Sequence, residues 1–87
     1  MSNSKKPVSK VVMYPVNAAI WRNENDKGEA WYNVTFERSF KNDAGEWQSS
    51  GTFNASDLLL LAKVADRAHS EIYKLRANDR QAQQIEE

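Results

Sequence analysis

Residues 29–41 read EAWYNVTFERSFK, and this stretch decides the fold because apolar and polar side chains alternate along it. The apolar set is Tyr32, Val34, Phe36 and Phe40. The intervening set is Trp31, Asn33, Thr35, Glu37 and Ser39. Alternation with a period of two is typical of a β-strand that has one buried and one solvated face. The stretch therefore predicts a strand of an antiparallel sheet.

Polar turn sequences flank this strand on both sides. Residues 25–28 (NDKG) and residues 42–45 (NDAG) contain the Asn, Asp and Gly residues that favour tight turns. They connect the strand to residues 17–24 (NAAIWRNE) and to residues 46–53 (EWQSSGTF), which we expect to form hairpins with it. Residues 8–14 (VSKVVMY) suit a further short strand before Pro15. The order of these segments predicts a four-stranded meander.

Side-chain parity predicts the register of both hairpins, because a slip by one residue would move every apolar side chain to the wrong face. In the first hairpin it places Ile20 opposite Val34. In the second it places Phe40 opposite Trp47, so that Trp47 joins the apolar face.

A long amphipathic helix is predicted after the last strand. Asn54 can cap it, and Asp57 places a carboxylate near the free N–H groups and the positive end of the helix dipole. From Asp57 to Leu75 there is no Gly or Pro, which predicts about five turns and a length of roughly 28 Å. The apolar stripe expected to face the sheet is Leu58, Leu61, Ala65, Ala68, Ile72 and Leu75. Beyond Leu75 the sequence is polar, and we expect fraying.

These elements define an α+β domain, a four-stranded antiparallel meander followed by one long C-terminal amphipathic helix packed on the sheet. We assign residues 1–7 to a flexible arm, residues 8–76 to the domain and residues 77–87 to a polar tail. Leu59, Leu60 and Val64 lie beside or opposite the stripe, which gives the helix more apolar surface than one sheet face needs. A chain this short, without cysteine, buries little surface alone. We therefore expect a homodimer through Leu59, Leu60 and Val64.

Composition narrows the class of protein. The 12 basic and 12 acidic side chains balance, which counts against a protein that grips duplex DNA through phosphates and less against one that stacks on single strands. No apolar segment is long enough for a signal peptide or a membrane span, so we expect a cytoplasmic protein without a membrane partner. With a single His and no Cys, the sequence offers no metal site, cofactor site or nucleophile, and we expect no enzyme activity.

Two tryptophans, Trp21 and Trp31, fall by parity on the solvated face of the sheet. Packing against a neighbouring strand or a subunit interface would explain them, and so would a role as stacking platforms for bases. The same parity places Gln48, Ser50 and Thr52 on this face. It places Arg38 on the helix side, where Arg38 would either extend past the helix end to solvent or pair with a helix carboxylate such as Asp66. The candidate nucleic-acid-binding residues are Trp21, Trp31, Arg22, Arg38, Lys41, Asn33, Thr35 and Lys10.

The four strand segments run directly into the capped helix NASDLLLLAKVADRAHSEIYKL, residues 54–75. This order of elements, over residues 8–76, resembles the single-stranded-DNA-binding β4α fold of the transcriptional positive-coactivator and Whirly families. The resemblance implies a dimer formed through the helices and a curved sheet that binds single-stranded DNA through aromatic and basic side chains. It implies that Trp21, Trp31, Arg22, Arg38 and Lys41 contact the strand.

Two functions follow as expectations. The first is a dimeric module that binds single-stranded DNA or RNA, as an accessory factor in transcription or DNA maintenance. The alternative is a protein interaction module that uses the Trp-bearing sheet face or the apolar helix surface.

Overall fold

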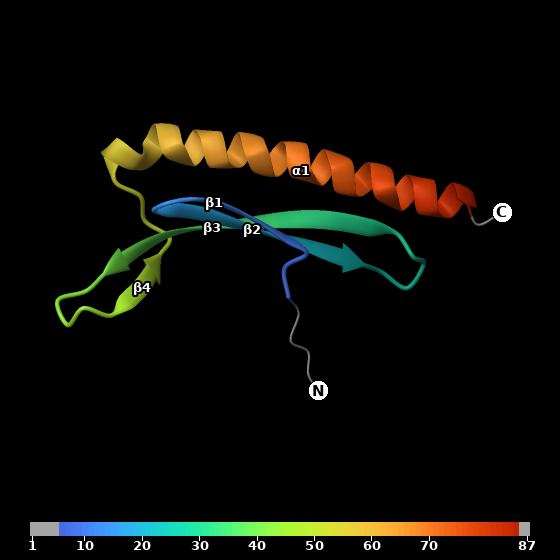
Figure 1. The fold of residues 1–87 in the computed structure, drawn as a ribbon. Coiled ribbons are helices and arrows are strands. Elements are labelled where there is room, and N and C mark those ends of the chain that lie inside the picture. Colours follow the sequence, from blue (N-terminus) through green and yellow to red (C-terminus); the bar gives the residue numbers. More distant parts are fainter. Residues whose placement is uncertain (1–5, 86–87) are drawn as a thin grey trace.

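Four antiparallel strands form one sheet, and a single long helix lies along one face of it (Figure 1). The structure, a computed structural model, describes the backbone of residues 6–85 and the side chains of residues 6–81. The elements are β1 (Ser9–Met13), β2 (Val16–Glu24), β3 (Ala30–Lys41), β4 (Trp47–Ser50), a 3-10 turn η1 (Ala55–Asp57) and α1 (Leu58–Ile85). The strand order β1-β2-β3-β4 confirms the predicted α+β meander. Most of the predicted N-terminal arm, residues 1–5, lies outside the described residues, as do residues 86 and 87.

The turn between β2 and β3 is organised by one asparagine. The Oδ1 atom of Asn25 accepts hydrogen bonds from the backbone N–H groups of Lys27 (2.9 Å) and Glu29 (3.0 Å). Gly28 has a φ of +82°, a left-handed conformation that strongly favours glycine. The turn closes a ladder in which Ile20 pairs with Val34, as predicted.

The turn between β3 and β4 repeats this arrangement with Asn42, whose Oδ1 accepts from Ala44 and Glu46 (2.9 Å each), and with Gly45 at φ +81°. The backbone N–H of Asn42 donates to the carbonyl of Glu46. Glu46 therefore lies opposite Asn42, and not opposite Lys41 as the predicted register requires. Phe40 therefore pairs with Gln48, and Trp47 pairs with Lys41.

The predicted register of this hairpin is thus wrong by one residue. Because side chains alternate between faces, the shift moves Trp47 to the face away from the helix and turns Gln48 and Ser50 toward the helix side. Pairing also ends at Ser50 rather than at residue 53. Phe53 still packs against the core from the connection to the helix.

The core lies between α1 and the middle of the sheet. Its fully buried members are Val16, Ala18, Ile20, Val64 and Ala68. The apolar side chains packed around them are Val11, Met13, Tyr32, Val34, Phe36, Phe53, Leu60, Leu61, Ile72 and Leu75.

The predicted stripe is confirmed at Leu61, Ala68, Ile72 and Leu75, and it is wrong in the first turns of the helix. Val64, assigned to a second surface, is 0% exposed and faces the sheet, and Leu60 packs beside it. Leu58, assigned to the core, is exposed, and Leu59 is 86% exposed. Leucine at every position from 58 to 61 lets several rotations give an apolar stripe, so spacing alone does not select one. The predicted dimer remains a prediction, and of its three residues only Leu59 is fully accessible in the monomer.

The structure also shows where the helix begins and ends. At the start, the Asp57 carboxylate accepts a hydrogen bond from the backbone N–H of Asn54 (3.3 Å), in agreement with the predicted cap region. At the far end, α1 continues to Ile85 instead of fraying after Leu75. Its 28 residues correspond to about 42 Å, and the helix runs along β1 and β2, whereas β4 and the adjoining end of β3 bend away from it (Figure 1). No helix within residues 6–85 is both long enough and apolar enough to cross a membrane.

Candidate functional site

The sheet face opposite α1, here called the open face, carries the candidate residues. Its members alternate with the buried residues of each strand, and no element within residues 6–85 covers them (Figure 1). They are Lys10, Val12, Asn17, Ala19, Trp21, Asn23, Trp31, Asn33, Thr35, Glu37, Ser39, Lys41, Trp47 and Ser49.

One aromatic group lies near the β2–β3 turn. Trp21 is half-buried, and its indole N–H donates to the Thr35 hydroxyl at 3.0 Å. Trp31 is 49% exposed. The side-chain amide of Asn23 donates a hydrogen bond to the side-chain oxygen Oδ1 of Asn33. The position of Trp21 is therefore fixed by its hydrogen bond to Thr35, whereas the Trp31 ring remains available for contact.

A second aromatic group lies near the β3–β4 turn and was missed by the sequence analysis. Tyr14 and Trp47 contact edge to face, with ring centroids 6.0 Å apart, and they are 67% and 58% exposed. The Lys41 ammonium lies 5.3 Å from the centroid of the Trp47 ring. The backbone N–H of Ser39 donates a hydrogen bond to the Pro15 carbonyl (2.8 Å), which attaches the segment after Tyr14 to β3.

A signal for this group was present in the sequence. Residues 25–29 (NDKGE) and residues 42–46 (NDAGE) share the form NDxGE, so both turns should close with Asn opposite Glu. Applied to the second turn, that rule places Trp47 on the open face beside Lys41.

A shallow recess of about 200 Å³ separates the two aromatic groups. Its lining includes Lys10, Ala19, Trp21, Thr35 and Glu37. The small Ala19 side chain leaves the middle of the sheet hollow. The open face thus offers polar contacts between two aromatic ends and carries both signs of charge.

The candidate residues divide between the two faces. The structure brings Trp21, Trp31, Asn33, Thr35, Lys10 and Lys41 together on the open face. It places Arg22 and Arg38 on the helix side. Arg38 donates from Nε to the Thr52 carbonyl (2.8 Å) and lies over the Phe40 ring, so the suggested pairing with Asp66 is not found.

Arg22 instead belongs to a polar cluster that joins the sheet to α1. The Tyr32 hydroxyl donates to Asp79 Oδ2 at 2.6 Å, and the Arg22 guanidinium lies 3.4 Å from Asp79 Oδ1 and 3.1 Å from Glu24. The hydrogen bond from Tyr32 and the positive charge of Arg22 lower the pKa of Asp79. Burial and the hydrogen bond to Asp79 raise the pKa of Tyr32. These contacts attach the polar part of the helix to the sheet at Asp79.

We predict that Asp79→Asn lowers the free energy of unfolding by about 1 to 2 kcal/mol at pH 7, because hydrogen bonds to a half-exposed carboxylate are lost. Since the folded-state pKa of Asp79 is lowered, its contribution is present above the ordinary value of 3.8 and disappears as pH falls through the folded value. The raised pKa of Tyr32 gives the opposite pH dependence: its contribution to the free energy of unfolding is lost as pH rises through the folded-state pKa of Tyr32.

Urea unfolding of the wild type and Asp79→Asn at pH 7 and pH 3 measures this difference. It should be largest at pH 7 and shrink at pH 3. Asp66→Asn, an exposed position on the same helix, is the matched control and should change stability little at either pH. A difference that grows toward acid would contradict the proposed role of Asp79.

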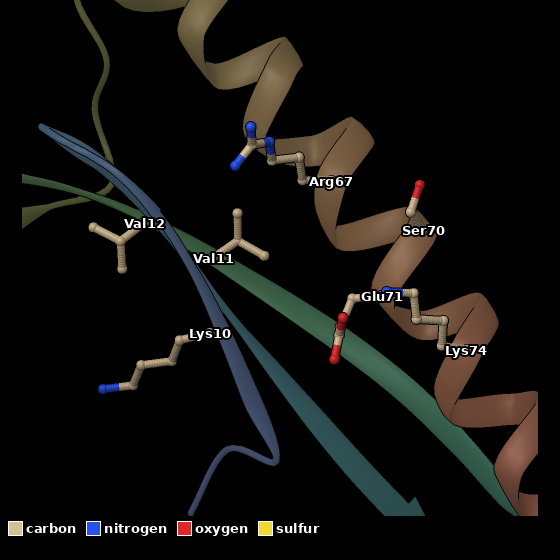
Figure 2. Close-up of a pocket in the computed structure, with 7 residues that line it drawn as sticks. All are labelled: Lys10, Val11, Val12, Arg67, Ser70, Glu71 and Lys74. Carbon is tan, nitrogen blue, oxygen red and sulfur yellow. The ribbon is translucent and has the colours of Figure 1, made fainter.

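A second recess, of about 390 Å³, lies between the edge strand β1 and α1 (Figure 2). Figure 2 shows Arg67, Ser70, Glu71 and Lys74 on the helix, with Val11 directed toward them from the strand. The Ser9 hydroxyl donates a hydrogen bond to the Glu71 carboxylate (3.3 Å). Because β1 has a strand neighbour on one side only, this recess borders a free sheet edge.

Neither a metal centre nor a known relative adds to this description. In the described part of the chain, no group of three His, Cys, Asp or Glu side chains lies close enough to hold a metal ion. A comparison of the chain with protein-family models, with curated proteins and with solved structures finds no match. The function is therefore argued from the geometry of the open face.

Proposed function

We propose that this protein binds single-stranded nucleic acid along the open face of its sheet, acting as a dimer with the β4α architecture of the positive-coactivator and Whirly families. The observation that carries the proposal is the exposure of Trp31, Trp47 and Tyr14 at the two ends of that face. Large exposed rings cost solvation free energy unless a ligand covers them, and every base has a face that stacks on an aromatic ring.

The spacing of the aromatic groups suits an extended strand. Trp21 pairs with Asn33 and Trp47 pairs with Lys41, so the two groups are eight residue steps apart along β3. At about 3.3 Å per residue this is roughly 26 Å. Known single-strand sites cover about 4 to 16 nucleotides per OB fold, so one bound strand of several nucleotides can reach both aromatic groups. Lys10 and Thr35 lie between the groups and offer hydrogen bonds to bases or phosphates, and Asn33 lies opposite Trp21.

A fluorescence-anisotropy titration tests the proposal. A labelled mixed-sequence single-stranded DNA is titrated with protein at about 50 and 200 mM salt, with matched duplex as competitor. We expect binding that weakens with salt and that duplex competes for poorly. The loss with salt should be modest, because Lys10 and Lys41 are the only cations on the open face within the described residues. Absence of binding at the lower salt contradicts the proposal.

A protein interaction module is the second candidate, favoured by the recess beside β1. An extended peptide can add a strand to a free sheet edge, and Arg67 and Lys74 beside this edge favour a peptide with acidic side chains. The exposed helix residues Leu59 and Tyr73 offer a further apolar contact. Robust binding of the oligonucleotide at low salt would count against this candidate.

A further inference from the structure

A basic pocket lies on the helix side of the sheet, where the far end of α1 passes the β2–β3 turn. Its volume is about 290 Å³, and its charged lining residues are Arg22, Lys27, Glu29, Arg76, Asp79 and Arg80. Arg76 and Arg80 are four residues apart, so they project from the same side of the helix. The pocket exists because α1 continues past Leu75.

The two acidic residues of this pocket are already engaged. Asp79 accepts from Tyr32 and Arg22, and Glu29 accepts from the Asn25 side chain at 2.8 Å. Within residues 6–81, the ion pairs are those of Arg22 with Glu24 and with Asp79. Lys27, Arg76 and Arg80 therefore present positive charge to the pocket without a carboxylate partner. Such an arrangement favours an anion.

Arg76 links this pocket to the open face. It also lines a neighbouring cavity of about 210 Å³ together with Trp31, Tyr32 and Ile72. β4 pairs with Arg38–Lys41 of β3, so no strand within residues 6–85 borders the β3 edge beside Trp31. A nucleotide stacked on Trp31 can thus extend around this edge toward Arg76 without meeting another strand.

We infer that Lys27, Arg76 and Arg80 form a phosphate subsite, which takes a phosphodiester of the strand whose base stacks on Trp31. This inference rests on the proposed function and names where the strand leaves the open face. Guanidinium groups bind phosphate oxygens through paired N–H donors, and two arginines on adjacent helix turns match one such group. The nearly neutral open face then needs few cations of its own, because the phosphate contacts lie around the edge.

The salt dependence of oligonucleotide binding tests the subsite. For single strands the slope of log K against log salt is about −0.7 per phosphate contact. In the double variant Arg76→Gln/Arg80→Gln one phosphate contact is lost, so we expect the slope to become less steep by up to about 0.7, with weaker binding at low salt. Arg67→Gln, which removes one charge from the same helix beside β1, should leave the slope unchanged. An unchanged slope in the double variant overturns the subsite even if the oligonucleotide still binds.

A second measurement separates failure of the subsite from failure of the proposed function. Sodium pyrophosphate is titrated into 15N-labelled protein, and the Arg Nε–H resonances are followed by NMR. Shifts at Arg76 and Arg80 that exceed those at Arg67 support the subsite even if no oligonucleotide binds. Absence of shifts, or equal shifts at Arg67, overturns it.

Discussion

Replacement of Trp31 or Trp47 by alanine is expected to weaken single-stranded oligonucleotide binding by about 1 to 3 kcal/mol in each case, or about 5- to 150-fold. The reason is that each exposed ring provides a stacking surface at one end of the open face. Neither ring belongs to the core, so the free energy of unfolding should change little. Anisotropy titration at about 50 mM salt measures the binding change, and urea unfolding measures stability.

Tyr73 supplies the matched control for this prediction. It is 71% exposed and lies on α1, so it does not belong to the open face. Tyr73→Ala should leave the affinity for the oligonucleotide unchanged. If Tyr73→Ala weakens binding as much as the tryptophan variants do, the interface lies on the helix and the open-face assignment is wrong. If Trp31→Ala and Trp47→Ala both bind as the wild type does, stacking on these rings is excluded.

Val64→Asp should unfold the protein at ordinary temperature. The Val64 side chain is fully buried between the helix and Ile20, Ala18 and Val16, so an aspartate there would place an unpaired carboxylate in the core. Such a change costs about 4 kcal/mol or more. That is a large part of the total stability of a domain of this length, about 4 to 13 kcal/mol. Circular dichroism and urea unfolding provide the measurement.

Leu59→Asp is the comparison, because it makes the same kind of change on the same helix at an exposed position. The folded protein should tolerate it with little loss of helical signal. Equal damage in both variants would contradict the assignment of Val64 to the core and Leu59 to the exterior. In that case Leu59 would be buried in the folded assembly, as the predicted dimer requires.

The architecture was predictable because strong periodicity and turn chemistry agree along most of the chain. The alternation in β3 and the asparagine-glycine turns predicted the strand order, and the pairing of Ile20 with Val34 followed from parity. The side of the first helical turns that faces the sheet was not predictable from spacing, since the leucine run before Val64 is compatible with several faces. The continuation of α1 beyond Leu75 was not predicted, and there Asp79 contacts Tyr32, which is distant in sequence.

The candidate site was predictable in part for the same reasons. Parity placed Trp21 and Trp31 on the open face, and the structure brings them together with Lys10 and Lys41. Trp47 was assigned to the wrong face because parity was applied to its apolar character, whereas the hydrogen bonds of Asn42 set the turn length. Tyr14 could not be placed, since its position depends on how the chain reverses at Pro15. Local hydrogen-bond geometry therefore outranked hydrophobic pattern at this hairpin.

The two kinds of attachment along α1 imply graded cooperativity. From Leu60 to Leu75 the helix is fastened by apolar burial, so opening that part should require unfolding of the sheet as well. Beyond Leu75, the attachment described in the structure is the polar cluster around Asp79, and its opening exposes little apolar surface. Amide hydrogen exchange should thus report a low-energy, sub-global opening of the last turns beneath the global transition. Any ligand that bridges those turns to the sheet would raise the free energy of the sub-global opening. It would leave the free energy of global unfolding almost unchanged.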